Sequence, residues 1–145
     1  MYGLKVKEKD LDGNTGHLEM SQGMFRALSL LCHINYACIS DTYKCVLLDD
    51  IGEGLDFDRS KKLIKLIIEK AKKNNFQLIM TSNDRFVMNS VPLKYWNVLL
   101  RKRNSCKVLN YKNSKPIFDE FEFTGLNNFD FFSNRFWEEE EFVNE

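Results

Sequence analysis

The stretch CVLLDDIGEGLD, residues 45–56, decides the fold of this chain. With the preceding lysine, it begins as a short apolar run over residues 44–48 that lacks alternation. Such a run is typical of a central strand in a parallel sheet, covered on both faces. Asp49 and Asp50 end the run, and a loop rich in glycine and acids follows. The stretch therefore predicts a buried strand with two carboxylates at its carboxyl end.

The segments that follow predict a second strand parallel to the first. Residues 57–73 place apolar side chains at helical spacing and lysines elsewhere, which indicates an amphipathic helix. Residues 76–81, FQLIMT, form another short apolar run, and polar residues 82–84 come next. Strands joined by a crossover helix pair in parallel, and ligands of such sheets bind beyond the carboxyl ends of the strands. The expected fold class is α/β with a parallel-sheet core.

The apolar run at residues 20–39 is too long for one strand and predicts a helix that begins at Ser21 as its N-cap. Apolar residues of this segment would lie on nearly every side of the helix, so we expect most of its surface to be buried. His33 lies within it and has no partner at metal-ligand spacing, which favours a core histidine over a metal ligand. Three of the four cysteines also stand in apolar runs, where a free thiol packs as a small hydrophobe.

The carboxyl-terminal third carries a weaker signal. Residues 95–100 and 106–111 predict a β-hairpin, with the basic segment RKRNS as its turn. Residues 117–137 are rich in phenylalanine, and we expect an irregular segment that packs against the sheet. These aromatic side chains are interpreted as core rather than as a surface on which bases stack.

Length and composition bound the possible functions. A chain of 145 residues is expected to form a single domain, residues 1–145, around one core. Lys plus Arg and Asp plus Glu both number 21, and zero net charge does not favour a nucleic-acid coat. The basic residues 101–103 could contact nucleic acid, although a hairpin turn is the simpler interpretation. No CxxC pair, signal peptide or membrane span occurs in the sequence, so we expect a cytoplasmic protein without a membrane partner.

The motifs resemble those of one enzyme family. Residues 47–56, LLDDIGEGLD, resemble the Walker B strand and D-loop of ABC-like AAA ATPases, which include the SMC-like and overcoming-lysogenisation-defect (OLD) families. Residues 20–24, MSQGM, resemble a degenerate ABC signature, and residues 77–84 stand where these families have a strand and a switch histidine. The order is that of the carboxyl-terminal half of an ABC-like ATPase domain with a P-loop NTPase fold. The resemblance is strongest over residues 18–90.

The resemblance implies ATP and Mg²⁺ as cofactors and assigns roles to eight residues. Asp49 would hold Mg²⁺ through water, Asp50 would position the attacking water, and Asn83 would sense the γ-phosphate. The remaining five, in the signature and the D-loop, would bind nucleotide or bridge subunits in a homodimer: Ser21, Gln22, Gly23, Gly54 and Asp56.

Three departures from the family pattern limit this functional interpretation. No GxxxxGK[ST] phosphate loop occurs in the sequence, so a Walker A lobe would have to come from a longer protein or a partner. Asp50 stands where the family has the longer glutamate, and Asn83 cannot titrate as histidine does. Glu53 is a nearby carboxylate that could substitute for either. The alternatives are a non-catalytic dimerisation or regulatory module with a decayed nucleotide site, and a Mg²⁺ site of a nuclease or phosphatase at the two acids.

The absence of a phosphate loop from this sequence predicts that the isolated chain binds ATP poorly. Without the backbone N–H groups and lysine of that loop, the main contacts to the β- and γ-phosphates do not exist. We expect the isolated 145-residue chain to bind Mg²⁺-ATP weakly or not at all in a calorimetric titration, and to hydrolyse none. Binding at micromolar concentration would contradict this prediction.

Overall fold

The computed structural model describes residues 3–9, 11–40 and 45–138. The chain divides into two compact units, residues 1–84 (unit 1) and 85–145 (unit 2), and each is described by itself. The prediction of a single domain stays a prediction. Among the described residues, no helix is both long and apolar enough to cross a membrane.

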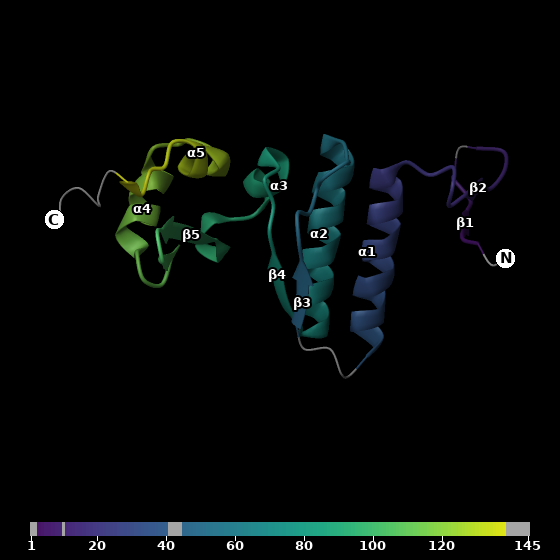
Figure 1. The fold of residues 1–145 in the computed structure, drawn as a ribbon, viewed down its shortest axis with the longest axis horizontal. Helices are drawn as coiled ribbons and strands as arrows, with labels where there is room; N and C mark the ends of the chain where they lie inside the picture. The colour runs from purple at the N-terminus through teal and green to yellow at the C-terminus, as the bar shows by residue number, and fades with distance from the viewer. Residues whose placement is uncertain (1–2, 10, 41–44, 139–145) are drawn as a thin grey trace. The chain divides into compact units, whose positions relative to one another are not determined.

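Unit 1 contains the predicted strand–helix–strand arrangement. After a short antiparallel pair, β1 (Lys5–Val6) and β2 (Thr15–Gly16), come α1 (Gln22–Ile39), β3 (Cys45–Leu48), α2 (Phe57–Asn74) and β4 (Gln77–Met80). β3 and β4 pair in parallel, with Cys45 opposite Gln77 and Leu48 opposite Met80. The predicted parallel pairing and its crossover helix are therefore confirmed (Figure 1).

The helix α2 forms where its sequence pattern predicts. The Asp56 side chain caps its first turn by accepting a hydrogen bond from the Arg59 backbone N–H at 2.9 Å. Asn75 ends it in the left-handed conformation, with φ of 54°. The apolar face is buried and packs on α1 and β4, and most of the lysines remain exposed. Its buried residues are Ser60, Leu63, Ile64, Ile67 and Ala71.

The helix α1 is much more exposed than predicted. Only Gly23, Ile34 and Ala37 are buried, whereas Tyr36 is 56% and Ile39 is 82% exposed. The prediction of a helix buried on most sides was wrong, because α1 packs chiefly on α2 and much of the rest of its surface is exposed. His33 and Cys32 are exposed as well, so their interpretation as core residues was also wrong.

The two parallel strands are covered on one face only. Burial alternates along both, and Leu47 on β3 and Ile79 on β4 are 73% and 47% exposed. The prediction that both faces are covered was wrong, because α2 packs on one face and the side chains of the other face remain exposed. Cys45, at the start of β3, is exposed for the same reason.

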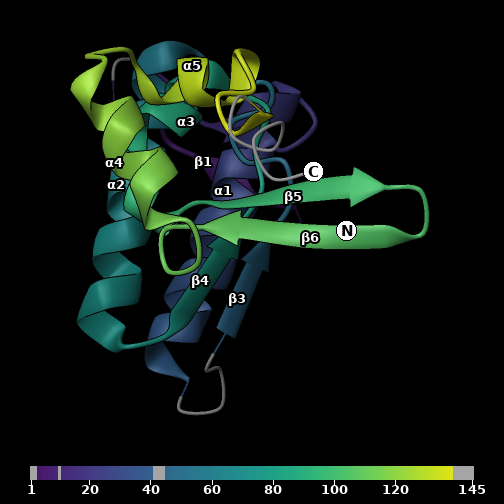
Figure 2. The same cartoon turned by 90° about the vertical axis from the view of Figure 1, so that its left-hand side faces the viewer.

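Unit 2 contains the predicted hairpin. It runs through α3 (Arg85–Ser90), a 3-10 helix (Leu93–Tyr95), β5 (Asn97–Lys102), β6 (Ser105–Asn110), α4 (Lys115–Phe123) and α5 (Asn128–Ser133). β5 and β6 pair antiparallel, from Asn97 opposite Asn110 to Lys102 opposite Ser105 (Figure 2). Only two residues join the strands, so the turn is shorter than the five-residue segment expected from the sequence.

The phenylalanine-rich segment is helical rather than irregular. Phe118 and Phe121 of α4 and Phe131 of α5 are almost fully buried, with the Phe118 and Phe131 ring centroids 4.9 Å apart. A capping box between Asn127 and Asp130 begins α5. These rings pack with Val98, Leu100 and Leu109 of the hairpin into one core. Their interpretation as core residues is confirmed, and the prediction of an irregular conformation was wrong because mutual packing orders two short helices.

The bare face of β3 and β4 predicts self-association. An exposed apolar strand face with unpaired edges invites pairing with another chain. We expect the isolated chain to form dimers or larger species at tens of micromolar in sedimentation velocity runs. The double variant Leu47→Asp, Ile79→Asn should shift it toward monomer, whereas Leu66→Asp on the exposed side of α2 should not. A wild-type chain that sediments as a single monomeric species would contradict the prediction.

Candidate functional site

The carboxyl ends of β3 and β4 bring the paired acids beside Thr81. The Thr81 hydroxyl donates to Asp49 Oδ1 at 2.5 Å and accepts a hydrogen bond from the Asp50 backbone N–H at 2.9 Å. A hydroxyl has a single proton, so this arrangement assigns it to the Asp49 carboxylate. Thr81 therefore orients the first acid and holds the backbone of the second.

The strand pairing continues past the last residues of β3 and β4. The Thr81 N–H donates to the Leu48 carbonyl, and the Ile51 N–H donates to the Thr81 carbonyl, both at 2.9 Å. The Ser82 hydroxyl then donates to the Ile51 carbonyl at 2.7 Å. Between these fixed points Asp50 adopts the left-handed conformation, with φ of 50°. Aspartate is among the non-glycine residues that tolerate it best. The acidic turn is thus held at both ends.

The glycine-rich loop uses its glycines to turn into α2. Gly52 and Gly54 have φ of 102° and 76°, which side chains with a Cβ rarely adopt. Asp56, predicted to bridge subunits through this loop, caps α2 and lies 3.2 Å from the Arg59 Nε. Its carboxylate is therefore engaged in local structure.

The start of α1 lies directly against this loop. The Ser21 side chain accepts a hydrogen bond from the Met24 backbone N–H at 3.2 Å, which confirms the predicted N-cap. Gly23, two residues later, is buried, and a Cβ added to it would lie 1.9 Å from the Gly54 carbonyl oxygen. The signature-like turn and the loop at 52–56 are thus in backbone contact, which only glycine at position 23 permits.

An ion pair spans the same junction. Arg26 of α1 pairs with Glu53 of the loop, and both side chains are more than half exposed. The hydrogen bond to Glu53 raises the pKa of Arg26, and the negative charges of Glu53 and of Asp50 add to this. Because Glu53 is held by Arg26, the hypothesis that it substitutes for a catalytic residue loses support. An exposed pair of this kind adds little to stability.

The structure connects some predicted residues and leaves others apart. Asp49 and Asp50 meet through Thr81, and Gly23 meets Gly54. Gln22 and Asn83 are exposed, and no hydrogen bond within the described part of the chain joins Asn83 to either aspartate. The motifs assign no role to Thr81 or Arg26, whose contacts with Asp49 and Glu53 join segments distant in sequence.

A metal site built wholly from protein ligands is not formed around the acid pair. Among residues 3–9, 11–40 and 45–138, no three His, Cys, Asp or Glu side chains gather closely enough to hold an ion. This weakens the nuclease or phosphatase hypothesis, because such sites need several direct carboxylate ligands. A single aspartate that holds an ion through water needs no such cluster.

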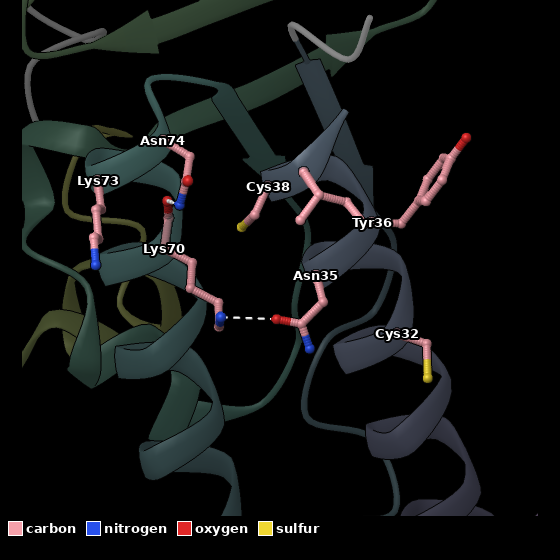
Figure 3. Close-up of a pocket in the computed structure, with 8 residues that line it drawn as sticks. Cys32, Asn35, Tyr36, Cys38, Lys70, Lys73 and Asn74 are labelled. Atoms are coloured by element: carbon pink, nitrogen blue, oxygen red, sulfur yellow. Dashed lines mark hydrogen bonds between the residues drawn. The ribbon is translucent and has the colours of Figure 1, made fainter. Parts of the chain in front are cut away.

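A groove lies elsewhere in unit 1, between the later turns of α1 and α2 (Figure 3). Its volume is about 610 Å³, and Lys70 Nζ donates to Asn35 Oδ1 at 2.8 Å within it. None of the residues predicted to bind nucleotide lines it. Its lining comprises Cys32, Asn35, Tyr36, Cys38, Ile39, Lys70, Lys73 and Asn74.

The comparisons with known proteins agree with the fold described above. No family model matches the chain, and no curated protein matches it significantly. Two chains of solved structures do match. One was determined in work on ATP-driven dimerisation and DNA-stimulated activation of SMC ATPases; it is 21% identical, with a TM-score of 0.58. The similarity covers 83% of this chain and 72% of that chain. The chain therefore has a fold related to that of SMC and ABC-like ATPases.

The contact between Gly23 and Gly54 can be tested by Gly23→Ala, which adds a single methyl group. Alanine favours a helix over glycine by about 1 kcal/mol, but the Cβ would collide with backbone that cannot turn aside. We expect Gly23→Ala to lower the free energy of unfolding by about 1–3 kcal/mol, as overpacking does. Urea denaturation followed by circular dichroism measures it.

The matched control is Gly16→Ala, whose Cβ would lie 3.4 Å from the flexible Glu19 side chain. It should leave the urea midpoint nearly unchanged. Equal midpoints for Gly23→Ala and the wild-type chain would show that the two segments are not in contact.

Proposed function

We propose that this chain supplies the carboxyl-terminal half of an SMC-like ATPase site and acts with a Walker A lobe from the longer protein or a partner subunit. The observation that carries the proposal is that residues 20–24, 49–56 and 81–84 converge in space through Gly23–Gly54 and Thr81–Asp49. The fold shared with an SMC ATPase structure supports it.

The donor set at the end of β3 fits a nucleotide-bound magnesium ion. Asp49 is exposed, and only one of its oxygens is engaged by Thr81, so the other is free to accept from a metal-bound water. Mg²⁺ bound with ATP would neutralise phosphate charge at this edge of the sheet. Asp49 would be the residue that orients it.

Asp50 and Asn83 would supply the chemistry beside the phosphate. The Asp50 backbone is fixed by Thr81, and its exposed carboxylate would orient the attacking water and accept its proton. Asn83 would donate a hydrogen bond to the γ-phosphate. Both groups are exposed, as a site completed by a second surface requires.

The first turn of α1 would contact the phosphate of an opposing subunit. Ser21 uses its oxygen as an acceptor for Met24, which leaves its hydroxyl proton for an anion. The N-terminal end of the 18-residue helix favours negative charge. Ser21, Gln22 and Gly23 would then meet nucleotide across a homodimer interface, with Gly54 and Asp56 holding the loop behind them.

The alternative is a non-catalytic dimerisation or regulatory module. Two observations favour it: Glu53 is held by Arg26, and no hydrogen bond joins Asn83 to either aspartate within the described residues. This alternative predicts no Mg²⁺-dependent ATP hydrolysis by the complete protein. The complete protein is identified by a GxxxxGK[ST] motif encoded in frame upstream or in a neighbouring gene.

The catalytic assignment is tested by Asp50→Asn in that complete protein. The amide keeps the size of the side chain but cannot accept a proton, so kcat should fall at least about 100-fold. Affinity for ATP, measured by a fluorescent analogue, should stay unchanged. Asp58→Asn, a neutralised acid in the first turn of α2, should keep wild-type turnover. Unchanged hydrolysis in Asp50→Asn would remove Asp50 from the site.

A further inference from the structure

We propose that the acidic carboxyl-terminal segment, residues 139–145 (the tail), docks on the exposed face of the β5–β6 hairpin of its own chain. The tail lies outside the described residues, and its sequence EEEFVNE carries four glutamates together with Phe142 and Val143. The inference goes beyond the proposed function, since neither the hairpin nor the tail contains a residue assigned to nucleotide chemistry. The two proposals can therefore fail independently.

Positive and negative charges are separated along the sequence of unit 2. No acidic residue stands between Arg85 and Phe118, a segment that carries eight cations. From Asp119 to Glu145 the balance reverses, with nine acids and Arg135 as the one cation. Opposite charges on two segments of one unit attract each other. The tail is therefore electrostatically complementary to the hairpin.

The hairpin has a face on which apolar and cationic side chains occur together. Leu99 and Arg101 point to the face opposite Val98, because successive residues of a strand alternate between faces. Val108 and Cys106 lie opposite them on β6. Leu99 is 68% and Val108 is 44% exposed, whereas Val98 packs into the aromatic core of unit 2. The exposed face thus offers an apolar pair next to a cation.

The cations at the tip of the hairpin lack an acidic partner within the described residues. Arg101, Arg103 and Lys107 are exposed, and none of them forms an ion pair inside residues 3–9, 11–40 and 45–138. By contrast, Lys115 pairs with Asp119. The tail holds four further carboxylates, which suit these three cations. Figure 2 shows the turn of the hairpin pointing away from α4.

The tail starts near the base of the hairpin and is long enough to follow it. Trp137, two residues before the tail, is buried in the same core as Val98. An extended chain spans about 3.3–3.6 Å per residue, so seven tail residues reach about 23–25 Å. The six-residue strand β5 spans about 20 Å. The tail can therefore extend along the whole exposed face.

Covalent attachment makes individually weak contacts sufficient for docking. Exposed ion pairs contribute little one at a time, and salt screens them. A segment joined to its target by a short linker acts at an effective concentration in the millimolar range. Several glutamates, with Phe142 on the Leu99–Val108 pair, therefore suffice to cover the face. The tail acts as a strap that salt loosens.

The thiol of Cys106 reports whether this face is covered. Cys106 is exposed on the hairpin, and Cys32 and Cys45 of unit 1 are exposed as well and serve as internal references. Alkylation of each cysteine by the uncharged reagent N-ethylmaleimide is followed in the full chain by peptide mass spectrometry. The tail variant Glu140→Lys, Glu141→Lys should speed alkylation of Cys106 at least about threefold, because the tail no longer shields the thiol or disfavours its reactive thiolate. The two reference rates should not change.

The matched control is Glu120→Lys, Glu122→Lys, which makes the same change of net charge at two exposed positions of α4. It should keep the wild-type rate at Cys106. Raising the salt to about 1 M shortens the Debye length to about 3 Å, which should speed alkylation of Cys106 in the wild-type chain but not in the tail variant. Circular dichroism melting should give all three chains the same midpoint, since no altered residue belongs to the core of unit 2.

Three outcomes would overturn the inference. One is an equal rate at Cys106 in the tail variant and the wild-type chain. Another is an α4 variant that is accelerated as much as the tail variant, which would reduce the effect to net charge. The third is a wild-type rate at Cys106 that falls as the protein concentration rises, which would assign the cover to a second copy of the chain.

Discussion

The parallel pairing of β3 with β4 is the constraint on which the candidate site depends. It continues past the last residues of both strands through the backbone and hydroxyl of Thr81, and this extension sets the positions of Asp49 and Asp50. The glycine turns at 52 and 54 then return the chain to the start of α1. A shift of one residue in the register would move Thr81 to the other face of the strand and separate it from the acids. The geometry of three motifs thus follows from one strand pair.

Helices and strands with a strong local sequence pattern could be predicted from the sequence. Which other elements cover them could not. The periodicity and caps of α2, the short apolar runs of β3 and β4, and the hairpin all depend on neighbours in sequence. The exposure of Leu47, Ile79 and Ile39 depends on which elements cover them, which short apolar runs do not encode. The same holds for α4 and α5, which are too short to be stable alone and are ordered by the packing of Phe118, Phe121 and Phe131.

The candidate site shows the same division. Parallel strands place their carboxyl ends at the same edge of a sheet. This topology alone puts Asp49, Asp50 and the residues after β4 at one edge. The contact of Gly23 with Gly54 and the pair Arg26–Glu53 join segments about thirty residues apart, and no local pattern signals them. Net charge is likewise a property of the whole composition, and equal numbers of acids and bases do not reveal that the acids are absent from residues 85–118.

The polar groups of the site separate into those that the fold uses and those that it leaves available. The Thr81 hydroxyl donates one hydrogen bond and accepts another within the acidic turn. Asp56 caps α2, and Glu53 pairs with Arg26. The Asp50 carboxylate and the Asn83 amide remain exposed. A stable fold does not need an aspartate in a left-handed turn, since glycine adopts that conformation without strain. The exposed carboxylate at position 50 is therefore the feature that the fold explains least, and it favours the catalytic proposal over a decayed module.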